Sequence, residues 1–346
     1  MSGASNPPAE LAAAIGRLYG LTVAGIEPVR SAWRLSTDLG CLYVKRTAAP
    51  PDILPFIVGL HDHLARAAPG LAPAVLRATD GAAHLDWAGH KYLVLCSLAG
   101  READYYRDGD LAAVAAGLRH LHSAARHNSL SPPGKSTWYG TWPFRLKERL
   151  ADLDRFVDLA KARGGPFDLA YRRLWHDYRP QAAAALAKIG GGDYRRQAAA
   201  ALAEREICHH DLSHRNVLIF RGRAGFLDLD YAVADSVLHD LANLAGHLLR
   251  LRTYAFHPVD AALASYYGGA RPEREAMEIL GAMLLWPQDY WQIGRQRYDE
   301  RQPWSEERFL ALLARKCGQP RSRLRFFRRF GRAYGLRGGS HWWEAG

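Results

Sequence analysis

A short stretch, residues 207–230, limits most strongly what this chain can fold into. Asp211 and Asn216 stand five residues apart in it, just before an apolar run at Val217–Phe220. A second apolar run, 225–229, follows an Arg-Gly-Arg-Ala turn and contains Asp228. Short apolar runs on either side of a glycine-containing turn predict a β-hairpin. A hairpin of this length would return Asp228 to the side of Asn216.

Oxygen-bearing side chains brought together in this way predict a site for a hard divalent cation. Asn216 and Asp228 are the candidate metal ligands, because Mg²⁺ prefers carboxylate and amide oxygens. Asp211 is the candidate catalytic base, which would accept or orient the proton of a hydroxyl group during phosphoryl transfer. We interpret His209 as a structural hydrogen-bonding residue. Asp230 has two open interpretations, as a further carboxylate near the metal or as a cap or ion-pair partner.

The same stretch resembles the catalytic segment of a known family. The letters HHDLSHRN at 209–216 are similar to the H-x-D-x-x-x-x-N loop of the aminoglycoside phosphotransferase and choline kinase superfamily. LDLDY at 227–231 and HDLA at 239–242 resemble the segment that follows this loop in the superfamily. The LDLDY pattern is most similar to that of the bacterial spore-coat CotS-type kinases. The resemblance extends over roughly residues 15–330.

This resemblance implies an α+β fold of the protein-kinase-like, bilobal kind, with a small β-rich N-terminal lobe and a larger, mainly helical C-terminal lobe. The implied domains are a nucleotide-binding lobe at 1–97 and a lobe with the catalytic loop and acceptor site at 98–346. The implied cofactors are ATP and Mg²⁺, and the implied activity is that of a kinase with an alcohol group as acceptor.

Lys45 is the candidate cation for the nucleotide phosphates. The chain has 7 lysines against 39 arginines, and Lys45 alone lies within the first ninety residues, in a β-rich run after the turn at 37–40. A lysine on a surface strand is the alternative interpretation. In related kinases this lysine pairs with an acid on the next helix, but the expected helix at 51–66 contains no glutamate. Either Asp52 or Asp62 takes that place, or the pair is absent.

Two further segments bear on nucleotide binding. Residues 27–38 contain no glycine, so a glycine-rich phosphate loop of the protein-kinase type is absent, although backbone amides at 30–34 can still contact phosphate. An apolar strand at 92–97 resembles the one that leads to the hinge in relatives. By position, the Cys96 carbonyl and the Leu98 amide would bind the adenine edge, and the Cys96 side chain itself would pack in the core.

Helical periodicity dominates the chain after residue 100. Long helices are expected at 111–126, 144–161, 167–189, 193–205, 236–254, 258–267, 272–298 and 305–316. A basic, aromatic-containing segment at 321–330 predicts an amphipathic helix whose phenylalanines pack inward. Its arginines would form a solvated basic face or, alternatively, contact an acidic partner.

Composition limits compartment and partners. Four scattered cysteines favour a reducing compartment and disfavour a disulfide framework or a zinc site. The N-terminal residues lack the pattern of a signal peptide, and no apolar run reaches the length of a membrane span. We therefore expect a cytoplasmic protein, with the resemblance adding a link to the spore coat and its proteins. Despite the net charge of +11, we expect neither a nucleic-acid nor a membrane partner.

The acceptor is expected to be a small molecule or glycan. Cationic aminoglycosides would favour an acidic cleft, which this basic chain does not predict, so a sugar, polyol or glycan is preferred. Tryptophans such as Trp286 and Trp291 are either part of an acceptor cleft or part of the core, and Asp289 is a candidate acceptor contact. The alternative function is a catalytically weak or inactive kinase-like nucleotide-binding protein with a structural role in the spore coat.

Overall fold

The computed structural model describes residues 9–344, and the chain divides into two compact units. The first unit comprises Met1–Thr137 and His209–Val233, and the second comprises Trp138–Cys208 and Ala234–Gly346. The chain passes between the units at residues 137/138, 208/209 and 233/234, where the short strands β7 (Ile207–Cys208) and β10 (Val233–Ala234) lie. The lobe boundary inferred at 97/98 stays a prediction.

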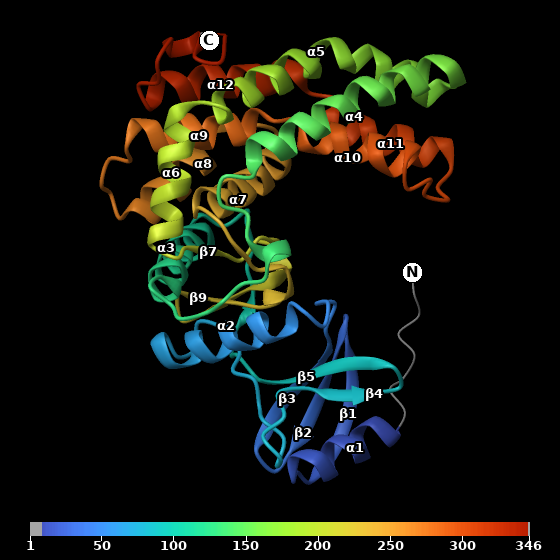
Figure 1. The fold of residues 1–346 in the computed structure, drawn as a ribbon, viewed down its shortest axis with the longest axis vertical. Helices are drawn as coiled ribbons and strands as arrows, with labels where there is room; N and C mark the ends of the chain where they lie inside the picture. The colour runs from blue at the N-terminus through green and yellow to red at the C-terminus, as the bar shows by residue number, and fades with distance from the viewer. Residues whose placement is uncertain (1–8, 345–346) are drawn as a thin grey trace. The chain divides into compact units, whose positions relative to one another are not determined.

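The first unit is built on a five-stranded antiparallel sheet with the order β1-β2-β3-β5-β4 (Figure 1). Its strands are β1 (Val23–Val29), β2 (Ala32–Thr37), β3 (Gly40–Arg46), β4 (Leu85–Trp87) and β5 (His90–Cys96). The strand expected around Lys45 is therefore confirmed as β3. Its register places Lys45 opposite Leu93 on β5, in the middle of the sheet.

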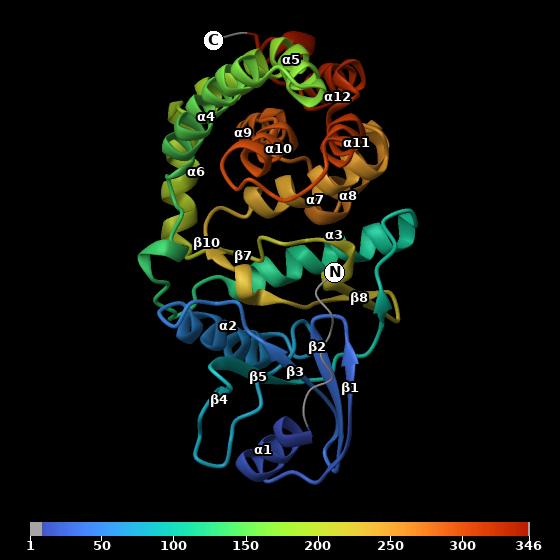
Figure 2. The same cartoon turned by 90° about the vertical axis from the view of Figure 1, so that its right-hand side faces the viewer.

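Two helices lie on opposite sides of this sheet, as Figures 1 and 2 show. Helix α1 (Ala9–Tyr19), which the sequence reasoning did not foresee, places Leu11 and Ile15 in a core with Leu35, Val44 and Val94. Helix α2 (Leu54–Ala67) begins with a proline in its first turn and buries an apolar stripe on the other side. Proline suits this position because a first-turn amide has no partner within the helix.

The rest of the first unit holds the catalytic segment. Strand β6 (Arg101–Glu102) pairs with β8 (Val217–Phe220), and β8 pairs with β9 (Arg223–Phe226). Helix α3 (Asp108–Ala125) packs on this small sheet at Gly117, where an added Cβ would lie only 2.8 Å from the Cβ of Ala224. A glycine is therefore needed for the helix to approach the hairpin. Short 3₁₀ turns complete the unit: η1 (Gly134–Ser136), η2 (His214–Asn216) and η3 (Leu229–Tyr231).

The described part of the second unit is helical apart from the short strands at its chain crossings. Its elements are α4 (Trp142–Arg163), α5 (Pro166–Ile189), α6 (Gly192–Ala203), α7 (Leu238–Leu251), α8 (Phe256–Tyr267), α9 (Arg274–Leu285), α10 (Gln288–Tyr298), α11 (Glu306–Cys317), α12 (Pro320–Ala333) and η4 (Gly339–His341). The long helices α4 and α5 pack along each other, and α5 also contacts α9 and α11. Stacked Tyr171 and Tyr290, with ring centroids 4.2 Å apart, join α5 to α10.

The structure confirms the α+β class, with a small antiparallel sheet in the N-terminal part and a larger helical C-terminal part. One expected helix was wrong: 272–298 is broken into α9 and α10 at Trp286-Pro287. Proline removes a backbone donor and clashes with the preceding turn, so the helix ends before it. Within residues 9–344, no helix combines the length and hydropathy that a membrane-spanning segment needs.

Candidate active site

The β8–β9 hairpin brings the two halves of the catalytic segment together. Its register pairs Val217 with Phe226, and the Leu227 amide donates to the Asn216 carbonyl at 2.8 Å. Asp228 therefore follows directly after a residue that pairs with Asn216, as the sequence predicts. The turn has two residues with positive φ, Arg221 (49°) and Gly222 (74°), as tight hairpins require. The second strand is shifted from the expected 225–229 to Arg223–Phe226.

Asn216 is held in a definite orientation by Asp211. Its Nδ2 donates to Asp211 Oδ2 at 2.8 Å and to the Asp211 carbonyl at 3.1 Å. Since the nitrogen is used in this way, the amide oxygen of Asn216 is left as an acceptor. Within residues 9–344, the second carboxylate oxygen of Asp211, Oδ1, has no protein hydrogen-bond donor. The pair thus presents one amide oxygen and one carboxylate oxygen for other ligands.

His209 has the structural role that the sequence suggested. Its ring is buried, its Nε2 lies 2.7 Å from the Leu227 carbonyl, and its Nδ1 accepts from the Asp211 amide at 3.3 Å. A ring that accepts at Nδ1 donates at Nε2, so this geometry fits the neutral Nε2–H tautomer. His209 therefore joins the loop that bears Asp211 to the strand end that bears Asp228.

Asp228 has an unusual backbone conformation. Its φ and ψ are both 64°, in the left-handed region, immediately before η3. This region is unfavourable for most side chains, and such residues cluster at functional sites where the surroundings hold them in place. Asp228 lies two residues after the end of β9, and its carboxylate is partly exposed.

Lys45 is bound by the catalytic segment itself. Its Nζ pairs with Asp228 Oδ1 and lies 3.0 Å from Asp230 Oδ2. The acids considered for this role near α2 have other partners: Asp62 pairs with Arg77, and Asp52 lies 3.4 Å from Lys135. Within residues 9–344, Lys45 thus pairs with carboxylates from the hairpin end. Asp230 is therefore an ion-pair partner, one of its two open interpretations.

The glycine-free segment forms a tight hairpin between β1 and β2. Arg30 takes a φ of 55° in its two-residue turn, pairs with Glu102, and donates from Nη1 to the Arg215 carbonyl at 3.3 Å. The turn is therefore tied to the backbone just before Asn216. The long side chain of Arg30 makes this link, and the turn forms without a glycine.

The donor set fits a magnesium ion. Asn216 offers an amide oxygen and Asp228 a carboxylate, and the Lys45 ammonium beside Asp228 shows that this carboxylate already binds a cation. In the described residues, no cluster of three or more His, Cys, Asp or Glu side chains could hold a metal. Mg²⁺ does not need one, because it keeps several waters and binds through one or two protein oxygens plus substrate phosphates.

Comparison with known proteins agrees with this geometry. Residues 25–280 match the phosphotransferase enzyme family. The matched range is about three quarters of the chain and includes the whole catalytic segment up to Asp230. The chain belongs to this family. It is a kinase-type phosphotransferase, as the catalytic loop suggested. The family match also includes Lys45 and the β1–β2 hairpin, so it spans the five-stranded sheet of the first unit apart from the start of β1.

Two solved phosphotransferase structures share the fold. The aminoglycoside phosphotransferase from Alicyclobacillus acidocaldarius superposes with a TM-score of 0.80 at 18% identity, over 96% of this chain and 98% of that one. Spectinomycin phosphotransferase, solved with ADP and spectinomycin, gives a TM-score of 0.64 at 12% identity, over 92% of this chain and 97% of that one. At these identities the likeness concerns the fold alone.

A curated sequence relative is spore coat protein S of Bacillus subtilis strain 168. It is 20% identical over 284 residues, which is 81% of either chain. This is a weak similarity, in the direction of the CotS-type resemblance.

Cys96 and Leu98, the two residues expected to bind the adenine edge, lie at the end of β5 and in the loop after it. Cys96 ends β5 opposite Leu42, its amide donates to the Ala74 carbonyl at 2.9 Å, and its side chain packs against the sheet core. Leu98 follows in the loop and approaches Gly225, whose added Cβ would lie 3.2 Å from Leu98 Cδ1. Their roles in adenine binding stay predictions.

Three supporting residues were missed by the sequence reasoning. Tyr105 donates its hydroxyl to the Leu212 carbonyl at 2.8 Å, and its burial and the nearby Asp211 carboxylate raise its pKa, so it remains a donor that holds the loop. Thr47 binds Asp230, and His61 lies buried on α2 with its Nδ1 2.6 Å from the Pro73 carbonyl. Each makes contacts distant in sequence, and no local pattern marks such residues.

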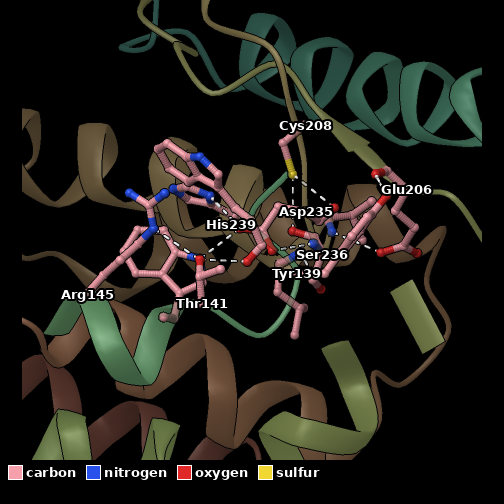
Figure 3. A network of polar contacts seen from close by, with 12 residues as sticks. Tyr139, Thr141, Arg145, Glu206, Cys208, Asp235, Ser236 and His239 are labelled. Carbon is pink, nitrogen blue, oxygen red and sulfur yellow. Dashed lines mark hydrogen bonds and ion pairs between the residues drawn. The ribbon is translucent and has the colours of Figure 1, made fainter. Parts of the chain in front are cut away.

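A separate polar network lies in the second unit (Figure 3). The buried Asp235 accepts from Trp142 Nε1 at 2.7 Å and pairs with His239 Nδ1 at 3.1 Å, while Glu206 accepts from the Val237 amide at 3.0 Å. Burial raises the pKa of the Cys208 thiol well above its usual range, so it is an unreactive member of this network. The network fixes the start of α7, where the HDLA letters lie.

The proposed acceptor residues of the second unit are engaged within it. Trp286 and Trp291 are buried, which confirms the core interpretation, and Asp289 pairs with Lys316 at 3.1 Å and with Arg250 at 3.5 Å. Helix α12 packs inward as predicted through Phe326, Phe327 and Phe330, and exposes most of its arginines.

Proposed function

We propose that this phosphotransferase moves the γ-phosphate of ATP, in a magnesium-dependent reaction, to a hydroxyl group of a small molecule or glycan. The observation that supports it most is the arrangement of Asp211, Asn216 and Asp228 around one point of the first unit, with Lys45 as their cationic neighbour. This is the set of groups that phosphoryl transfer needs: a carboxylate for the nucleophile, oxygen ligands for the metal and a cation for the phosphates.

Asp211 is the proposed catalytic base. Its Oδ2 is fixed by Asn216 Nδ2 at 2.8 Å, so Oδ1 is the oxygen available to an acceptor hydroxyl. The hydroxyl proton would move to this oxygen as the hydroxyl oxygen attacks the γ-phosphorus and the bond to the departing ADP breaks. Tyr105 keeps the loop in position through the Leu212 carbonyl, so the base does not need to move.

Asn216 and Asp228 are the proposed metal ligands. Their oxygens suit Mg²⁺, which neutralises phosphate charge when bound. Lys45 would contact the nucleotide phosphates, and the Cys96 carbonyl and Leu98 amide would bind the adenine edge. When Asp228 binds the metal, its contact with the Lys45 ammonium weakens, and this frees Lys45 for phosphate.

The acceptor class is proposed from charge and from relatives. Spectinomycin phosphotransferase and an amicoumacin kinase are solved with their namesake compounds, so small molecules are acceptors for proteins of this fold. This chain has a net charge of +11, which disfavours strongly cationic acceptors. We therefore prefer a sugar, polyol or glycan, without a nucleic-acid or membrane partner.

A second candidate function is motivated by the similarity to spore coat protein S. In that case the protein binds nucleotide but acts as a structural component of the coat, with little or no turnover. The hairpin without glycine and the absence of a helix acid paired with Lys45 are the features that favour it.

Thermal unfolding with ATP and Mg²⁺, followed by ADP release over a panel of sugars, polyols and aminoglycosides, separates the two candidates. The proposed activity predicts stabilisation by Mg·ATP and acceptor-stimulated ADP release with at least one hydroxyl compound. Stabilisation without turnover on any acceptor favours the structural role. The absence of both contradicts nucleotide use altogether.

A further inference from the structure

One carboxylate oxygen of Asp230 contacts several groups at the end of strand β3. Its Oδ2 lies 3.0 Å from Lys45 Nζ, and it accepts from Thr47 Oγ1 at 3.1 Å and from the Ala48 amide at 2.9 Å. The Asp230 side chain is only 3% exposed. A buried carboxylate is tolerable only when its hydrogen bonds and its counter-charge are satisfied, and here one oxygen meets both needs.

Asp228 differs from Asp230 in exposure and in the number of its partners. Its side chain is 26% exposed, and within residues 9–344 it pairs with Lys45. An exposed carboxylate with one cationic partner can exchange that partner for a metal ion. Asp230 is only 3% exposed, and its Oδ2 also accepts from Thr47 and Ala48, so its carboxylate is held against the end of β3 and is less open to a metal ion. Asp228 and Asp230 are thus suited to different roles, although only one residue separates them.

Helix α2 offers an uncharged side chain near this pair. His61, 2% exposed, places Nδ1 2.6 Å from the Pro73 carbonyl. Burial is the main cause that lowers the pKa of His61, and the Lys45 charge lowers it further. The carboxylates Asp230 and Asp62 have the opposite effect. The ring is therefore neutral at pH 7. The α2 acid Asp62 is turned to Arg77.

We propose that Asp230 is the positioning residue for Lys45. It holds the ammonium at the phosphate site when Asp228 binds metal, and it replaces the helix acid that this chain does not use. The inference rests on the proposed function. Lys45 lies near the end of β3, and Thr47 and Ala48 follow that strand, so the link joins this segment directly to η3 without a residue of α2.

The first test compares Asp230→Asn with Asp62→Asn, which removes an equal charge from α2 at an acid that does not pair with Lys45. Asparagine keeps the size and one acceptor oxygen, so Thr47 and Ala48 retain a partner. Calorimetry of ADP binding without magnesium should show affinity about tenfold or more weaker in Asp230→Asn, the loss expected for a hydrogen bond to a charged group. Asp62→Asn should bind within about twofold of the wild type.

The same variants are labelled with an amine-acylating reagent, without nucleotide, and Lys45 modification is followed by mass spectrometry. An ammonium held in the ion pair with Asp230 is shielded from the reagent, so Asp230→Asn should label Lys45 several times faster than the wild type or Asp62→Asn. Unchanged ADP affinity and unchanged labelling would overturn the proposal. Weakening seen only when magnesium is present would overturn it too, because it makes Asp230 a metal ligand. A wild type that binds no nucleotide refutes the proposed function, while labelling still tests the contact.

A rescue variant tests whether the charge is what matters. Adding His61→Glu to Asp230→Asn moves the acid to α2, at a buried position within electrostatic range of Lys45 and Asp230. Partial recovery of ADP affinity and slower Lys45 labelling support the proposal. A folded double variant that remains as weak and as reactive as Asp230→Asn contradicts an electrostatic role for Asp230.

Discussion

Asn216 donates from Nδ2 to Asp211 Oδ2 at 2.8 Å, and this bond orients both side chains of the candidate active site. It turns the amide oxygen of Asn216 away from Asp211 and leaves Asp211 Oδ1 for a hydroxyl group. The proposed metal ligand and the proposed base thus orient each other within the protein itself, before any substrate binds. Such preorganisation is how phosphoryl transfer is mainly accelerated.

Replacing Asn216 should therefore affect two steps at once. We expect Asn216→Ala to weaken magnesium-dependent nucleotide binding about tenfold or more, and to lower kcat because Asp211 loses its donor. Titration of magnesium at fixed ATP and steady-state kinetics measure the two effects. Asn216→Asp is the matched comparison: it retains an oxygen ligand but places two carboxylates side by side, so it should keep metal binding better than catalysis. Wild-type magnesium dependence in Asn216→Ala would contradict the ligand assignment.

Removing Asp228 should separate metal binding from nucleotide binding. Asp228→Ala loses a carboxylate ligand, so we expect ATP affinity to fall about tenfold or more with magnesium and to change little without it. Calorimetry with and without magnesium makes the comparison. Equal affinity of wild type and variant in the presence of magnesium removes Asp228 from the metal site.

The approach of α3 to the hairpin predicts a cost for added volume. Gly117→Ala would place a Cβ 2.8 Å from Ala224 Cβ, so we expect a loss of about 1–3 kcal/mol in the free energy of unfolding. Gly109→Ala is the control, because it lies on the same helix with nothing within 4 Å of the new Cβ. Urea denaturation should show a loss in the first variant and none in the second. Equal stability of the two variants would mean that the interface yields without cost.

His61 predicts a pH dependence of stability. Its folded-state pKa lies below the ordinary 6.5 because the ring is buried. Below pH 6.5 the unfolded chain binds a proton that the folded chain resists, so stability is full above this pH and falls as pH drops toward the folded-state pKa. The slope is up to about 1.4 kcal/mol per pH unit. His61→Gln should remove this part of the dependence.

Urea denaturation at pH 7.5, 6.5 and 5.5 compares wild type with His61→Gln. The difference between their unfolding free energies should change between pH 6.5 and 5.5 and stay constant between 7.5 and 6.5. Parallel curves over the whole range would show that His61 titrates alike in the folded and unfolded states.

The local parts of the site could be predicted from sequence, and the distant contacts could not. Asn216 and Asp228 are joined by one short hairpin, so spacing alone brings them together. Lys45 could be placed on a strand, but its pairing with Asp230 depends on how β3 meets η3, which no local pattern specifies. The sequence therefore suggested Asp52 or Asp62, near the helix, as the partner of Lys45. Both acids have other cationic partners in the structure.

The fold shows the same contrast. Helical periodicity located most helices of the second unit within a few residues, because one apolar stripe faces its core. Pro287 indicates the break between α9 and α10. The apolar pattern continues across this proline, so periodicity alone predicts one long helix. Helix α1 was missed because its stripe is short and rich in alanine, and it becomes clear only against the sheet core.

The most direct test of the central claim compares wild type with Asp211→Asn on an acceptor found in the hydroxyl-compound panel. Asparagine keeps a hydrogen-bonding oxygen for Asn216 but cannot take the proton. We expect Mg·ATP affinity within about twofold of the wild type and a kcat for phosphoryl transfer lower by about 100-fold or more. Transfer to the acceptor at the wild-type rate by Asp211→Asn would contradict it.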